Sequence, residues 1–223
     1  MFPLYDENRS RTKPYVTWIL IIVNVIVFIW QFNRGLLENS YASWLDIRTY
    51  GAIPNNIMNV DRLYTLLTSM FMHGGISHIV GNMLYLFIFG DNIEDRFGHI
   101  KYLVIYLVFG VIAGLTHSWF SIGDDLYIPT IGASGAISGV LGAYVLLYPR
   151  ARVATIIFLG YFGRIIKIPS IFMLGFWFIM QFLYSFLDPY SNVAYWAHIG
   201  GFIIGFIVAI PFKISKTRKQ RDW

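Results

Sequence analysis

Four side chains in this sequence are of types that could together hydrolyse an amide bond. Two of them are Ser134 and His198. A serine hydroxyl is a weak nucleophile until a base removes its proton, and histidine titrates near neutral pH. The other two, His78 and Asn82, are spaced i, i+4, so one helix face could present both as donors to an oxyanion. The sequence therefore suggests a serine nucleophile, a histidine base and an oxyanion hole.

The residues around Ser134 favour this chemistry. Pro129 and the small residues after it predict a turn that leads into a helix. The backbone amides of Ala133 and Ser134 would lie at the positive end of that helix and could complete the oxyanion hole. No acidic residue accompanies His198, so we expect a Ser134–His198 dyad rather than a triad. Helix packing is the simpler alternative for this segment, because glycines four residues apart let membrane helices approach closely.

Composition places these residues in a membrane protein. The 223 residues are 57% hydrophobic and only 13% charged, with a mean hydropathy of +0.58, whereas soluble domains are about one quarter charged. Cysteine is absent, which excludes disulfides, thiol catalysis and thiolate metal sites. No His-Glu-x-x-His motif occurs, so a zinc protease is not indicated. We expect neither a metal nor another cofactor.

Apolar stretches predict an all-α membrane protein with six transmembrane helices and an uncleaved first helix. The predicted spans are Tyr15–Phe32, Ile76–Phe89, Tyr102–Trp119, Ile131–Tyr148, Ser170–Leu187 and Ala194–Phe212. A seventh apolar stretch, Ala154–Phe162, would form a helix of about 14 Å, too short for a bilayer core of about 30 Å.

Basic residues predict the orientation of these spans. Nearly all of the 17 lysines and arginines fall on the face that carries both termini. The exceptions are Arg34, Arg48 and Arg62. The positive-inside rule then places both termini in the cytoplasm. The net charge of +5 therefore reflects topology, and no nucleic-acid partner is expected.

The chain is predicted to consist of a cytoplasmic tail (1–14), a six-helix domain (15–212) and a basic cytoplasmic tail (213–223). The first external connection, about Asn33–Gly75, is long and mixes aromatic with charged residues. That mixture is typical of a loop lying in the membrane interface.

Positions along the predicted helices place the four chemical side chains at one depth. The reference point is the first basic residue at the cytoplasmic end of each helix, namely Arg96, Arg150 or Lys213. At about 1.5 Å per residue, all four side chains lie roughly 21–27 Å from these cytoplasmic charges. Polar groups inside a membrane are costly, so their alignment indicates a functional layer.

At these residues the sequence resembles the rhomboid family of intramembrane serine proteases, over nearly its whole length. The family's Gly-x-Ser-Gly corresponds to Gly132-Ala133-Ser134-Gly135, its His-x-x-x-Asn to His78-Ile79-Val80-Gly81-Asn82, and its Ala-His-x-x-Gly to Ala197-His198-Ile199-Gly200-Gly201. The resemblance implies that Ser134 is the nucleophile, that His198 is the base, and that His78 and Asn82 form the oxyanion hole.

The resemblance also assigns structural positions. Gly201 matches a glycine that brings the sixth helix close to the fourth, and Glu94 matches an acidic position at the cytoplasmic end of the second helix. Tyr64-Thr65 replaces a Trp-Arg pair that many members have in the first loop. Ser138 stands where some members have an aromatic residue stacked on the catalytic histidine.

The remaining polar residues receive simpler interpretations. Asn24 and Gln181 are interpreted as helix-contact residues, and His73 as a support of the first loop. His99 and His117 are not assigned a function.

The implied function is that of an endopeptidase that cleaves transmembrane segments of other proteins within the bilayer. The implied form is the minimal six-helix type of bacterial or archaeal plasma membranes, and the oligomeric state stays open. Two alternatives are a catalytically inactive relative that binds membrane proteins and, with less support, a small transporter. A serine-directed covalent probe would separate a protease from a transporter.

Overall fold

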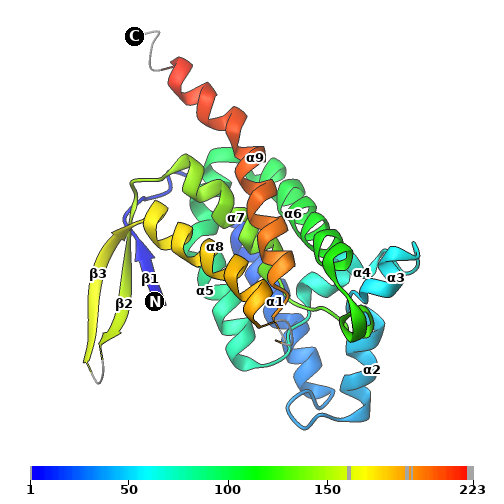
Figure 1. Ribbon diagram of the computed structural model, residues 1–223. Helices are drawn as coiled ribbons and strands as arrows, with labels where there is room; N and C mark the ends of the chain where they lie inside the picture. The colour runs from blue at the N-terminus through cyan, green and yellow to red at the C-terminus, as the bar shows by residue number, and fades with distance from the viewer. Residues whose placement is uncertain (1, 160–161, 189–190, 192, 220–223) are drawn as a thin grey trace.

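The computed structural model describes residues 2–159, 162–188, 191 and 193–219, and it is mostly helical (Figure 1). Each of the six predicted spans overlaps one helix of 14 residues or more. These helices are α1 (Tyr15–Asn33), α5 (Ile76–Phe97), α6 (His99–Phe120), α7 (Ser134–Leu147), α8 (Ser170–Leu187) and α9 (Tyr195–Lys219). The domain boundary predicted at Phe212 falls inside α9, which continues to Lys219.

Four of these helices, α1, α6, α8 and α9, are long and apolar enough to cross a membrane within the part of the chain that the structure describes. Helix α7 is apolar but has only 14 residues, or about 21 Å. Helix α5 has 22 residues and carries charged side chains in its last two turns. A mostly helical, multi-pass bundle is therefore present, and the count of six spans stays a prediction.

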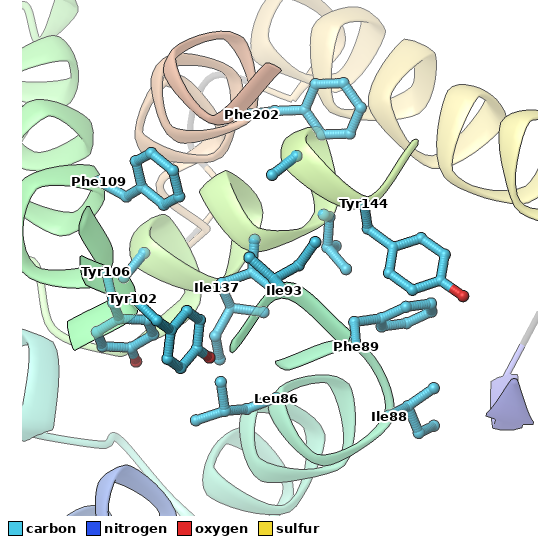
Figure 2. Close-up of a cluster of buried hydrophobic side chains, with 14 of the residues drawn as sticks. Leu86, Ile88, Phe89, Ile93, Tyr102, Tyr106, Phe109, Ile137, Tyr144 and Phe202 are labelled. Carbon is cyan, nitrogen blue, oxygen red and sulfur yellow. The ribbon is translucent and has the colours of Figure 1, made fainter. Parts of the chain in front are cut away.

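Helix α7 lies at the centre of the bundle. Helices α5, α6, α8 and α9 all contact it, and all of its residues from Gly135 to Val145 are buried. In Figure 2, Ile137 and Tyr144 of α7 lie among large side chains of α5, α6 and α9. These are Leu86, Ile88, Phe89, Ile93, Tyr102, Tyr106, Phe109 and Phe202. Close packing on all sides fixes the position of α7 relative to its neighbours.

Helix α9 approaches α7 closely because glycines face each other along the contact. A Cβ atom added to Gly201 would lie 2.1 Å from the carbonyl oxygen of Gly135. One added to Gly205 would lie 1.8 Å from the carbonyl oxygen of Gly139. Both distances are far below van der Waals contact, so a larger residue would push the two helices apart.

The prediction of an all-α fold is wrong in one region. A three-stranded antiparallel sheet, in the order β1-β2-β3, consists of β1 (Phe2–Asp6), β2 (Arg152–Leu159) and β3 (Phe162–Pro169). In Figure 1 the β2–β3 pair stands off one side of the helices. The stretch that is too short for a helical span is rich in β-branched residues, which favour strands. Its pairing with β1, a strand from the distant N-terminus, could not be read from local pattern.

The first external connection is folded into short helices. They are α2 (Tyr41–Tyr50), α3 (Pro54–Met58), α4 (Thr65–Thr68) and a 3-10 turn at Ser69–Phe71. Helix α2 lies at the end of the bundle opposite to the C-terminal end of α9 (Figure 1). An ion pair of 2.8 Å joins Arg34 to Asp46, and the hydroxyl of Thr68 donates to the carbonyl of Tyr50 at 2.7 Å. These contacts join the connection to the end of α1 and join its short helices to one another.

At the other end of the bundle, Glu94 of α5 holds the start of α1. Its carboxylate accepts hydrogen bonds from the backbone amides of Val16 and Thr17 at 2.9 and 2.8 Å. The hydroxyl of Thr17 and Nδ1 of His99 lie 2.7 and 2.6 Å from the same carboxylate. A negative charge beside the free amides of a helix N-terminus is favourable. Glu94 thus ties three helices together.

Candidate active site

Ser134 and His198 form a hydrogen bond. Ser134 is the first residue of α7, and His198 lies in the first turn of α9. The serine Oγ lies 2.8 Å from Nε2 of His198, which is the distance that a nucleophile and its base require. Both side chains are only half-buried, so a substrate can reach them.

The second ring nitrogen of His198 also has a partner, and that partner was missed by the sequence analysis. Nδ1 lies 2.7 Å from Oε1 of Gln181 on α8. The ring of Trp177, one turn earlier on α8, lies 5.8 Å from the ring of His198. Gln181 is thus more than the helix-contact residue that we expected. The only sequence signal was an amide in an apolar span, which did not indicate its partner.

Asn82 and His78 lie on α5 and face the same cavity as Ser134. Asn82 is 7% exposed, and its Nδ2 has no hydrogen-bond partner among the described residues. Nδ1 of His78 accepts a hydrogen bond of 3.3 Å from the amide of Gly74, so a neutral ring carries its proton on Nε2. Two donors are therefore available in the cavity, as an oxyanion hole requires.

The turn before Ser134 has a conformation that requires glycine. Gly132 has φ of 127°, which side chains rarely adopt. A Cβ atom there would also lie 2.8 Å from Nε2 of His78. The amide of Gly132 donates to the carbonyl of Ser69 at 2.9 Å. This turn therefore brings the backbone close to His78 and presents Ser134 at the helix start.

The first external connection holds the same turn from the other side. Ala52 and Thr130 form an antiparallel bridge, with hydrogen bonds of 3.0 and 2.8 Å in the two directions. Helix α7 begins at Ser134 with the usual free amides of a helix N-terminus. These amides lie next to the serine itself, as the sequence predicted for a helix that starts near Ala133 and Ser134.

A cavity of about 770 Å³ contains all four chemical side chains. Residues from α5, α6, α7, α8 and α9 line it, together with the segment before Ser134. This volume is within the usual range of ligand-binding cavities in proteins. No group of three metal-ligating side chains occurs within the described ranges.

Gln31 of α1 holds the backbone of His73 in the loop before α5. The side chain of Gln31 on α1 accepts from the amide of His73 at 2.9 Å and donates to its carbonyl at 3.1 Å. The imidazole is fully buried, and burial, with the nearby His78, lowers the pKa of His73 to about 4. It is therefore neutral at physiological pH and packs edge-on against His78, with ring centres 5.1 Å apart.

The fold and this site define a member of the rhomboid family. The family's domain model, described as "Rhomboid domain", matches residues 60–214, and the chain belongs to this family. It is 31% identical to "Rhomboid protease GluP" of Bacillus subtilis, over 96% of this chain and 39% of that protein. It is 31% identical to "RHOMBOID-like protein 12, mitochondrial" of Arabidopsis thaliana, over 89% of this chain and 59% of that protein.

A third relative has nearly the same length. The chain is 27% identical to "Putative rhomboid protease YdcA" of Bacillus subtilis, over 96% of both proteins. By contrast, it spans about two fifths of GluP and three fifths of the Arabidopsis protein. The similarity to YdcA therefore extends over nearly the whole chain, beyond the residues 60–214 that the domain model matches.

Proposed function

We propose that this protein is an intramembrane serine endopeptidase with Ser134 as nucleophile and His198 as general base. The observation that carries the proposal is the 2.8 Å hydrogen bond between Oγ of Ser134 and Nε2 of His198. It occurs in a cavity that also contains an unpaired amide donor on Asn82. Homology to rhomboid proteases supports the same conclusion.

The proposed reaction begins with attack of Oγ of Ser134 on the carbonyl carbon of a peptide bond. Nε2 of His198 takes the hydroxyl proton as the new C–O bond forms. The carbonyl oxygen becomes an oxyanion, which Nδ2 of Asn82, Nε2 of His78 and the free amides at the start of α7 can stabilise. Collapse of this intermediate breaks the C–N bond, and the leaving nitrogen takes the proton from His198.

Water completes the proposed cycle. His198 removes a proton from water, whose oxygen attacks the acyl carbon on Ser134. The second tetrahedral intermediate uses the same donors, and its collapse returns the proton to Oγ of Ser134. Each step needs only the groups already in the cavity and water from its open side.

The proposed substrates are transmembrane segments of other proteins, cut near their outer ends. Four apolar helices and the family fold make this a multi-pass membrane protein. The distribution of basic residues supports both termini on the cytoplasmic side, in a bacterial or archaeal plasma membrane. Because α7 is about 21 Å long, Ser134 at its outer end would lie below the opposite membrane surface.

A fluorophosphonate probe tests the proposal. We expect rapid covalent labelling of the purified protein in detergent, mapped by mass spectrometry to Ser134, and no labelling of Ser134→Ala. Ser138→Ala is the matched control, because Ser138 lies one turn further along α7, is buried, and bonds the carbonyl of Ser134. Absence of labelling in the wild-type protein would favour the inactive relative or the transporter.

A further inference from the structure

The inference concerns Gln181, whose side chain reaches the catalytic pair from a third helix. Its Oε1 lies 2.7 Å from Nδ1 of His198, on the opposite side of the ring from Ser134. Helix α8, which carries Gln181, packs against α9. The sequence offers no carboxylate for this role, and among the described residues no acidic group contacts His198.

The chemistry of an amide oxygen fixes what this contact can do. Oε1 of glutamine only accepts hydrogen bonds, so it requires a proton on Nδ1 of His198. A neutral imidazole carries one proton, so Nε2 then presents a lone pair to Ser134. The other tautomer would present an N–H to the serine and could not remove its proton.

We propose that Gln181 is a positioning residue that holds His198 in the tautomer and orientation required for general-base catalysis. The proposal rests on the proposed function of the Ser134–His198 pair. Gln181 would orient the histidine as the aspartate does in a Ser-His-Asp triad, but its side chain is uncharged. It orients the ring without placing a negative charge in the membrane interior, where such a charge is costly.

Trp177 complements this contact. Its ring lies 5.8 Å from that of His198, and a second contact, at 6.3 Å, places it beside Phe202 of α9. The aromatic side chain beside His198 therefore comes from α8. Gln181 and Trp177 are one turn apart, so a single helix supplies both supports of the base.

Two variants test the role. Gln181→Met keeps the length of the side chain but removes the strong acceptor. Gln181→Glu, assayed at a pH at which its carboxylate is ionised, presents only acceptor oxygens. We expect Gln181→Met to lower the rate of fluorophosphonate labelling at Ser134 about tenfold or more, equivalent to about 1.4 kcal/mol in activation free energy. Gln181→Glu should be labelled at a rate within about threefold of the wild-type rate. The matched control is Phe182→Leu, the neighbouring side chain on the exposed face of α8, which should label at the wild-type rate.

A second measurement detects the tautomer itself. We would label the histidines with ¹⁵N and identify the His198 signals by their loss in His198→Ala. The wild-type protein should show a proton on Nδ1 and none on Nε2, and Gln181→Met should show a mixture of the two forms. A merely structural role would leave this pattern unchanged.

The outcomes separate this inference from the proposed function. Wild-type labelling that depends on Ser134, together with an unchanged rate and tautomer in Gln181→Met, would overturn the role of Gln181 and leave the protease intact. A loss of labelling in Gln181→Glu equal to that in Gln181→Met would also overturn it, because an acceptor alone would not suffice. Absence of wild-type labelling at Ser134 would overturn both.

Discussion

Two buried polar clusters at opposite ends of the bundle differ in how completely their groups are paired. At the end of the bundle where α5 ends, Glu94 is fully buried and receives hydrogen bonds from two backbone amides and a hydroxyl, with His99 also in contact. At the opposite end, Asn82 is almost as buried, yet its Nδ2 has no partner within the described part of the chain. The carboxylate of Glu94 is fully paired, whereas Asn82 has one donor left without a partner.

This difference indicates that Glu94 stabilises the fold, whereas Asn82 keeps a donor free for a ligand. A buried donor without a partner costs about 1–3 kcal/mol, and such groups are rare in native proteins. Glu94 avoids that cost and joins α1, α5 and α6. Asn82 bears it beside a serine–histidine pair, where an oxyanion would supply the missing partner. The predictions below test this contrast.

The largest effect is expected at His198. His198→Ala removes the base from Ser134, so we expect cleavage to fall by about 10⁴–10⁶-fold. The apparent melting temperature in detergent should stay within a few degrees of the wild-type value, since a half-buried side chain is lost. A large fall in melting temperature would show that His198, like Glu94, stabilises the fold.

Asn82→Ala should slow cleavage by about 10²–10³-fold without unfolding the protein. One oxyanion donor is lost, while His78 and the backbone amides remain. Removing Nδ2 of Asn82 leaves no protein partner unsatisfied and relieves the cost of a buried unpaired donor, so the free energy of unfolding should not fall. If Asn82→Ala and the wild-type protein had equal turnover at matched concentrations of folded protein, Asn82 would not be an oxyanion donor.

Glu94→Ala should have the opposite profile. Losing the carboxylate leaves the first turn of α1 uncapped, which should cost about 2–4 kcal/mol of stability and lower the apparent melting temperature by roughly 5–15 °C. The rate constant per folded molecule should stay within about threefold of the wild-type value. Asp95→Ala is the matched control, since Asp95 makes similar bonds to Thr12 at the surface and should matter much less. Equal stability losses in the two variants would contradict the special role of Glu94.

The smallest effect concerns pH and strand β1. Burial, together with the charge of Asp91 and despite a hydrogen bond from Tyr144, raises the pKa of Asp6 from 3.8 to about 7. The attached strand therefore keeps a proton that a detached strand would release, and its attachment weakens as pH rises from about 4 to about 7. Hydrogen exchange in β1, corrected for its intrinsic pH dependence, should be several-fold faster at pH 8 than at pH 5. Asp6→Asn should abolish the difference, and a difference that persists in this variant would rule out Asp6 as its source.

The contrast also shows what the sequence could and could not predict. The positions of the long helices, and the meeting of Ser134, His198, His78 and Asn82 in one cavity, were predictable, because apolar length and position along a helix are local properties. The sheet was not predictable, since its first strand lies at the N-terminus and pairs with β2, which follows four of the long helices. Gln181 was not predictable for a similar reason. A single amide on a helix gives no information about which neighbouring helix it faces.

Proteolysis by wild-type and Ser134→Ala protein in liposomes tests the central claim most directly. The substrate is a synthetic peptide of about 25 residues, long enough to span the bilayer, with an Ala-Gly segment near its outer end and a fluorophore and quencher on either side of that segment. We predict cleavage by the wild-type protein within this segment and none by the folded Ser134→Ala variant. Equal cleavage by both proteins, or none by a wild-type protein that binds the peptide, would contradict the account.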